Sequence, residues 1–133
     1  MGQVGPAQMR ARTKQFAIRV VKLFQSLPNT AEARIIGQQL LRSATSVGAN
    51  YRAACLARSK KEFIAKMGIV REETDESVFW LELLQDAGVF RGDQLAGLLR
   101  ESGELSSIFF ASLRTAKGSV SSPRSGFNSS IPQ

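Results

Sequence analysis

The sequence RSATSVGANYRAACLARSKKEF, residues 42–63, joins the end of one long helical pattern to the start of the next through almost no loop. Its first half is built from small residues, which at helical spacing let a neighbouring helix approach closely. In its second half, Ser59 and Glu62 have the spacing of a capping box, in which each side chain accepts from the backbone N–H of the other residue. We therefore predict one helix ending near Ala57 and another beginning near Ser59, paired as an antiparallel hairpin.

Apolar residues at helical spacing predict one more helix on each side of this hairpin. Leu27-Pro28 ends the first, because a residue before proline is pushed out of helical geometry. Gly88 is expected to terminate the third as a C′ glycine, and Asp93 to cap the fourth. The predicted helices span 12–26, Asn29 or Thr30 to 57, 59–87 and 93–117. Short connections between them favour an all-α, up-down-up-down four-helix bundle.

The two ends of the chain differ in composition from this central part. Residues 1–11 hold two Gly and a Pro without periodicity, and residues 118–133 hold six Ser with two Pro and two Gly. Such segments bury too little apolar surface to fold. We expect a flexible arm over 1–11, the bundle over 12–117 and a disordered Ser-rich tail over 118–133.

Helix packing is expected to be close along the hairpin. Gly37 and Gly48 each cost about 1 kcal/mol inside a helix relative to Ala, which indicates tight contacts at those points. Pairing residues at equal distances from Arg58 places Ser43 near Thr74, Leu40 near Ser77 and Asn50 near Met67, so that hydroxyls from both helices meet. The third helix has a heptad seam and also a second apolar flank of Ile64, Phe79, Trp80 and Leu83, for which an oligomer neighbour is the economical partner.

The segments RSATSVGAN and RSKKEF, with Leu27-Pro28, Gln39 to Ala44 (QLLRSA) and Trp80 to Gly88 (WLELLQDAG), resemble the bacterial four-helix-bundle family described from intervening sequences of 23S ribosomal RNA genes. The similarity runs from about Phe16 to Phe90. Many relatives carry an acidic residue where this chain has Ala53, so a role for that carboxylate is absent here.

This resemblance implies an up-down helical bundle that assembles as a ring-like homopentamer, with a role on nucleic acid. A structurally similar relative is the accessory protein of diversity-generating retroelements, a basic pentamer that works with a reverse transcriptase and RNA. The expected partners are therefore further copies of this chain, RNA or DNA, and a protein such as a reverse transcriptase.

The formal charge of +7 and the pI near 10.3 predict attraction to polyanions, nucleic acid first. The charge is uneven. Residues 1–27 hold five basic residues and no acid, whereas residues 59–88 hold four basic and seven acidic residues. This asymmetry could serve RNA binding, or the acids at 72–76 could meet a basic helix of a neighbouring subunit.

Nine basic residues form the candidate nucleic-acid-binding set: Lys14, Arg19, Lys22, Arg34, Arg42, Arg52, Arg58, Lys60 and Lys61. The last three cluster at the hairpin tip, where a ring would repeat them around its rim and add their phosphate contacts by avidity. Arg42 is equally well placed to pair with Glu73 across the hairpin. No base-reading motif is visible, so binding should follow the backbone or shape of the nucleic acid.

The residues for catalysis are missing. The chain has no histidine and one cysteine, which removes Ser-His-Asp and Cys-His arrangements and zinc sites. Glu72 and Glu76 share a helix face, but two carboxylates make a weak Mg²⁺ site, so we expect no metal and no cofactor. The lone Cys55 suits a reducing cytoplasm, and the short apolar runs predict no membrane span.

The predicted function is a non-enzymatic, basic, homo-oligomeric scaffold that binds RNA or DNA. The alternative is a protein-interaction adaptor that recruits a partner such as a reverse transcriptase without touching nucleic acid itself. The two differ in salt dependence, because phosphate binding weakens log-linearly with salt and an apolar interface does not.

Overall fold

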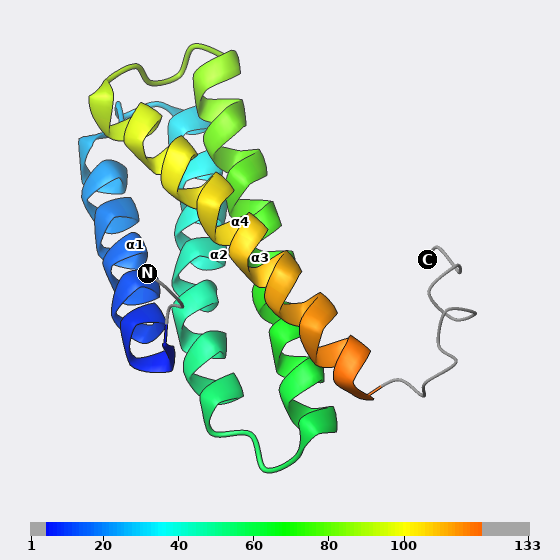
Figure 1. Cartoon of the computed structure of the whole chain (residues 1–133). Helices are drawn as coiled ribbons and strands as arrows, with labels where there is room; N and C mark the ends of the chain where they lie inside the picture. Colours follow the sequence, from blue (N-terminus) through cyan, green and yellow to red (C-terminus); the bar gives the residue numbers. More distant parts are fainter. Residues whose placement is uncertain (1–4, 121–133) are drawn as a thin grey trace.

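The structure, a computed structural model, describes residues 5–120, which form four α-helices and no strand. They are α1 (Pro6–Ser26), α2 (Ala31–Cys55), α3 (Lys60–Asp86) and α4 (Asp93–Val120). The helices α1, α2 and α3 run lengthwise and α4 crosses them at an angle (Figure 1). The pairs in contact are α1–α2, α2–α3, α3–α4 and α1–α4, so that all four surround one core. The predicted four-helix, all-α class is confirmed. Residues 1–4 of the predicted arm and 121–133 of the predicted tail lie outside the described residues.

Two helix ends differ from the prediction. The helix α1 begins at Pro6 and not at Arg12, so residues 6–11 are helical and not a flexible arm. Proline at the first helical position has a backbone φ already set for the helix, and Gly5 precedes it in extended geometry. At the other end, α4 continues to Val120, three residues into the segment predicted as tail.

The other boundaries follow the local capping chemistry. Thr30 caps α2, its hydroxyl accepting from the Ala33 N–H at 3.2 Å. Ser59 caps α3, its hydroxyl accepting from the Glu62 N–H at 3.0 Å. The carboxylate of Glu62 accepts from the Arg58 N–H at 2.9 Å, one residue before the expected partner. Gly88 adopts φ +70° after the C-terminus of α3, as expected of a C′ glycine.

The α4 helix runs without a break through Ser102-Gly103, although glycine has a low helix propensity. Ser102 is buried, and its hydroxyl donates to the Leu99 carbonyl at 3.1 Å. Asp93 is the first helical residue and not the cap. Its carboxylate therefore lies in the first turn, where it interacts favourably with the positive end of the helix dipole.

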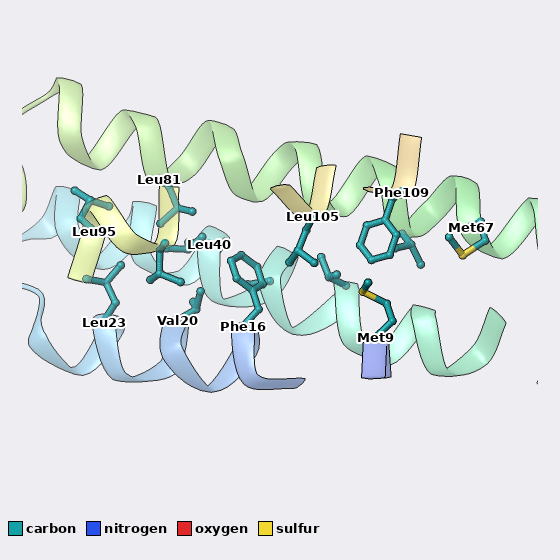
Figure 2. Close-up of a cluster of buried hydrophobic side chains, with 14 of the residues drawn as sticks. Met9, Phe16, Val20, Leu23, Leu40, Met67, Leu81, Leu95, Leu105 and Phe109 are labelled. Atoms are coloured by element: carbon teal, nitrogen blue, oxygen red, sulfur yellow. The ribbon is translucent and has the colours of Figure 1, made fainter. Parts of the chain in front are cut away.

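The core consists of the apolar stripes of all four helices. Figure 2 shows side chains of α1 facing those of α2, α3 and α4 across the bundle axis. The largest fully buried side chains include Phe16, Leu23, Leu40, Met67, Leu81, Leu95, Leu98, Leu105 and Phe109. Their 3–4 spacing in the sequence matches the face that each helix presents inward, so the predicted stripes are confirmed.

Gly37 is buried against side chains at the C-terminal end of α1. A Cβ added there would lie 2.7 Å from Leu27 Cδ1 and 2.9 Å from Phe24 Cδ1, so glycine permits this contact. A Cβ at Gly48 would meet the Thr13 carbonyl oxygen at 3.5 Å, an ordinary contact distance. The prediction of tight packing is confirmed at Gly37, where the close neighbours are side-chain atoms, whereas at Gly48 the α1 backbone itself lies at van der Waals distance.

Gly103 is a glycine whose replacement should stabilise the protein. It lies inside α4, and a Cβ there would have no neighbour within 4 Å. Gly103→Ala should raise the free energy of unfolding by about 0.5–1 kcal/mol, because alanine has the higher helix propensity. Thermal denaturation followed by circular dichroism measures the change. Gly37→Ala serves as the comparison, since Leu27 and Phe24 would have to move; a larger gain at Gly37 than at Gly103 would contradict this packing.

A hydroxyl pair connects α2 and α3 inside the core, but in a different register from the predicted one. Ser43 Oγ lies 2.9 Å from Ser77 Oγ and not beside Thr74, whose hydroxyl donates to the Val70 carbonyl at 2.7 Å. Side chains on a helix lean toward its N-terminus. On α2 they lean away from the connecting turn and on α3 toward it, so the partner on α3 lies farther from the turn by nearly one helical turn.

Tyr51 is the only tyrosine, and it is half-buried with its ring centroid 5.8 Å from that of Phe109. Burial, with a smaller effect of Cys55, raises the pKa of Tyr51 to about 12. The unfolded chain should lose this proton near pH 10. Between these values the folded state keeps the proton that the unfolded state has released, so stability falls as pH rises through that window.

We therefore expect phenolate absorbance of the folded protein to titrate with a midpoint near pH 12, whereas in denaturant the midpoint should return to about pH 10. Equal midpoints under the two conditions would show that the Tyr51 hydroxyl is fully hydrated in the folded protein.

Candidate nucleic-acid interface

A groove of about 410 Å³ lies between α1 and α2 and carries basic side chains on both walls. On α1, Arg10 and Lys14 are one helical turn apart, and Arg52 stands opposite them on α2. All three are exposed. The remaining lining is small or short: Ala11, Ala17, Thr45, Gly48 and Ala49. Because small side chains form the floor of the groove and basic side chains form its rim, a phosphate backbone can approach the helices closely here.

The charges of this groove are not neutralised within the described chain. Among residues 5–118, Arg10, Lys14 and Arg52 form no ion pair with a carboxylate. The α1 sequence contains no acidic residue at all, and Glu32 is the only one in α2. The groove therefore presents its full positive charge to solvent and to any anionic ligand.

Arg12, one residue away from the groove, shows the opposite arrangement. It faces α4, where Nε and Nη2 donate to the two carboxylate oxygens of Glu101 at 2.7 and 2.9 Å, and Nη2 also donates to Glu104 at 2.8 Å. The hydrogen bond to Glu101 is the main reason that the pKa of Arg12 is raised. This bidentate contact connects α1 to α4, and the carboxylates neutralise the charge of Arg12.

Arg42 is neutralised in the same way. Its guanidinium donates to Glu76 at 2.5 Å and to Glu73 at 3.4 Å across the hairpin, and Glu76 also accepts from the Trp80 indole N–H at 3.2 Å. The hydrogen bond to Glu76 raises the pKa of Arg42, and the same bond lowers the pKa of Glu76. The pairing of Arg42 with Glu73 is confirmed, which makes Arg42 a link between α2 and α3.

The other predicted basic residues are distributed over several surfaces. Arg19 lies against α4, since a Cβ at Gly97 would be 2.9 Å from its Nη2. Arg34 donates to Asn29 Oδ1 at 3.1 and 2.8 Å. Lys22 is exposed on α1, and Arg58, Lys60 and Lys61 are exposed at the hairpin tip. The structure thus brings Lys14 and Arg52 into one groove and keeps the tip cluster together, while the remaining residues stand apart.

Arg10 belongs to this groove, but the sequence pattern did not predict it, because Arg10 fell in the predicted arm. Its position is fixed by the extra turns of α1 that begin at Pro6. The signal was present: Pro6 as a first helical residue, followed by Met9, Thr13 and Phe16 at helical spacing, all three buried in the structure.

Charge is also unequal along the bundle axis. The half containing the hairpin tip (residues 6–16, 44–73 and 107–118) holds eleven basic and three acidic residues, and the other half (17–43 and 74–106) holds six basic and eight acidic residues. The contacts of Thr13 with Gly48 and of Phe109 with Tyr51 place the three segments of the first half side by side. The groove and the hairpin tip therefore lie at the same, strongly positive end (Figure 1).

The carboxylates do not assemble into a metal site. No group of three or more His, Cys, Asp or Glu residues that could hold a metal ion occurs within the described part of the chain. Glu76 is occupied by Arg42 and Trp80. In the same residues, no helix has the length and hydrophobicity needed to cross a bilayer.

The comparison with known proteins agrees with this bundle. The family model of the 23S rRNA-intervening sequence protein matches residues 7–111. The chain belongs to this family. The matched region contains nearly all of α1, the whole of α2 and α3 and most of α4, and it reaches back to Ala7, in line with the early start of α1.

A solved structure is similar to this family member over most of its length. It is a protein of unknown function from the S23 ribosomal protein family of Bacteroides thetaiotaomicron VPI-5482, solved at 1.70 Å resolution. The two chains share 31% sequence identity with a TM-score of 0.74, over 82% of this chain and 97% of the other. No curated protein matches the chain.

Proposed function

We propose that this family member is a non-catalytic scaffold that binds RNA or DNA through the phosphate backbone. The observation that carries the proposal is the α1–α2 groove, in which Arg10, Lys14 and Arg52 face solvent without carboxylate partners in the described chain. No aromatic side chain lines the groove, so recognition there rests on charge and not on base stacking. The positive hairpin-tip end extends the same field.

We further propose that the up-down-up-down bundle assembles as a homo-oligomer, a ring of five copies as the family resemblance implies. Phe79 is 53% exposed on α3 and packs edge-on against Trp80 with ring centroids 4.9 Å apart. An aromatic pair on the surface of a small bundle is typical of a protein interface. Repetition of the groove in each copy would raise the affinity for a long polyanion by avidity. Light scattering on the full-length protein measures the copy number, and a monomer would contradict this proposal.

The test of nucleic-acid binding is a fluorescence-anisotropy titration with labelled duplex DNA and structured RNA over a series of salt concentrations. We expect binding at low salt that weakens log-linearly with salt concentration, with a slope of about −0.9 for each phosphate contact on duplex DNA. Absence of binding to both probes at low salt would contradict the proposal. The adaptor function would then be the better hypothesis, with a protein such as a reverse transcriptase as the partner to search for.

A further inference from the structure

An exposed aromatic ring with two guanidinium groups lies on the surface between α3 and α4. Phe110 of α4 is 43% exposed. The Cζ atom of Arg71, on α3, lies 4.7 Å from its ring centroid, and that of Arg114, one turn further along α4, lies at 5.7 Å. Both distances are within the range of cation–π attraction. This cluster contains none of the nine basic residues predicted from the sequence.

The two arginines keep their charge available for a ligand. Neither forms an ion pair with a carboxylate in residues 5–118. For Arg71 this is informative, because Asp75 stands one turn away at the i, i+4 spacing that favours such a pair. The guanidinium of Arg71 instead lies over the Phe110 ring. Because the ring has no formal negative charge, the positive charge of Arg71 is not neutralised.

Space for a ligand lies directly beside the ring. A surface hollow of about 390 Å³ is lined by Phe110, Ala111, Arg114 and Thr115. The short side chains of Ala111 and Thr115 leave Phe110 and Arg114 as its large walls. The hollow therefore combines a flat apolar surface, a planar cation and a hydroxyl in one place.

We propose that Phe110, Arg71 and Arg114 bind an unpaired nucleotide of single-stranded nucleic acid. The base stacks on the exposed surface of the Phe110 ring and its guanidinium neighbours, and the flanking phosphates pair with Arg71 and Arg114. Aromatic rings and guanidinium planes are the usual stacking surfaces for splayed bases, and base stacking of this kind is independent of sequence. A duplex offers no free base face, so this site distinguishes single strands from duplexes.

The charges favour nucleic acid over a protein partner as the occupant. Phe110, Arg71 and Arg114 lie in the same half of the bundle as the α1–α2 groove and the hairpin tip, where basic residues greatly outnumber acidic ones. A protein surface would need clustered carboxylates to match this charge, whereas each nucleotide carries both an anion and a stacking face. The inference rests on the proposed function, since it names the form of nucleic acid that the scaffold holds.

The test uses the full-length protein and two labelled probes, a single-stranded RNA and a duplex of the same length. Phe110→Leu removes the ring and keeps an apolar side chain, and it should weaken single-strand binding by about 5- to 100-fold with little effect on the duplex. Phe110→Tyr should restore single-strand affinity. Ile35→Ala is the control, because Ile35 is also an exposed apolar side chain but lies in the other half of the bundle.

A second measurement reports stacking directly. Trp80 is the only tryptophan, and its indole N–H is held by Glu76 on the flank of α3 that faces Arg42. Phe110→Trp should show fluorescence quenching by the single strand beyond that of the unsubstituted protein.

The inference would be overturned if Phe110→Leu lost affinity equally for both probes, or for neither. The proposed function would then be judged from duplex binding alone. A changed oligomeric mass with unchanged single-strand affinity would overturn the inference in favour of a protein interface. Binding of neither probe by the unsubstituted protein would overturn both.

Discussion

The double charge reversal Lys14→Glu, Arg52→Glu is expected to lower the affinity for duplex DNA by about two orders of magnitude at about 0.1 M salt. Each phosphate contact contributes a factor of about ten at this salt concentration through counterion release, and both contacts are lost. The salt slope should also fall in magnitude by about 2. Anisotropy titration of the variant across the same salt series measures both quantities.

A matched control separates the groove from the overall charge of the protein. Arg91→Glu with Arg100→Glu changes the net charge by the same amount at two exposed positions outside the groove lining. This control should lose less affinity and keep a slope near that of the unsubstituted protein, because it removes long-range attraction but no phosphate contact. Equal losses in the two double variants would mean that the bundle attracts nucleic acid without using the groove.

Phe109→Ala is expected to reduce the free energy of unfolding by about 3–5 kcal/mol. Phe109 is 1% exposed, packs against Tyr51 and is part of the core cluster shared by the four helices (Figure 2). The truncation removes buried apolar area and leaves a cavity into which the surrounding helices relax only partly. Urea denaturation followed by circular dichroism measures the loss as a lower transition midpoint.

The neighbouring residue provides the control for this experiment. Phe110→Ala removes the same side chain from the surface, where its described contacts are the two guanidinium groups, and should cost about 1 kcal/mol or less. If the two variants were destabilised equally, the assignment of Phe109 to the inner face and of Phe110 to the outer face of α4 would be wrong.

Much of the fold could be predicted because its signals are local. Ser59 with Glu62 and Gly88 each act on the backbone within one turn, so their residue types and spacing are enough to locate a helix end. The buried stripes are equally local, since helical geometry alone decides which residues share a face. Pro6 is a local signal as well, and giving it full weight would have extended the first helix back to include Arg10.

Contacts between helices were harder to predict, because they depend on how two elements lie against each other. Counting residues from Arg58 gave Thr74 as the partner of Ser43, whereas the lean of the side chains makes it Ser77. The groove joins Lys14 to Arg52, which are far apart in the sequence and come together only through the packing of α1 on α2. For Arg71, the i, i+4 spacing favours Asp75 on the same helix, and no single-helix argument could have revealed the ring of Phe110 on α4.

The unequal charge along the bundle axis gives the molecule a permanent electrostatic orientation. In the field of a polyanion, a body with most of its cations at one end experiences a torque as well as an attraction. The protein should therefore turn during its approach, so that the hairpin tip arrives first and the carboxylates of the distal half of α3 trail behind. Fewer encounters are then wasted on unproductive orientations, and this advantage shrinks as added salt shortens the distance over which the field is felt.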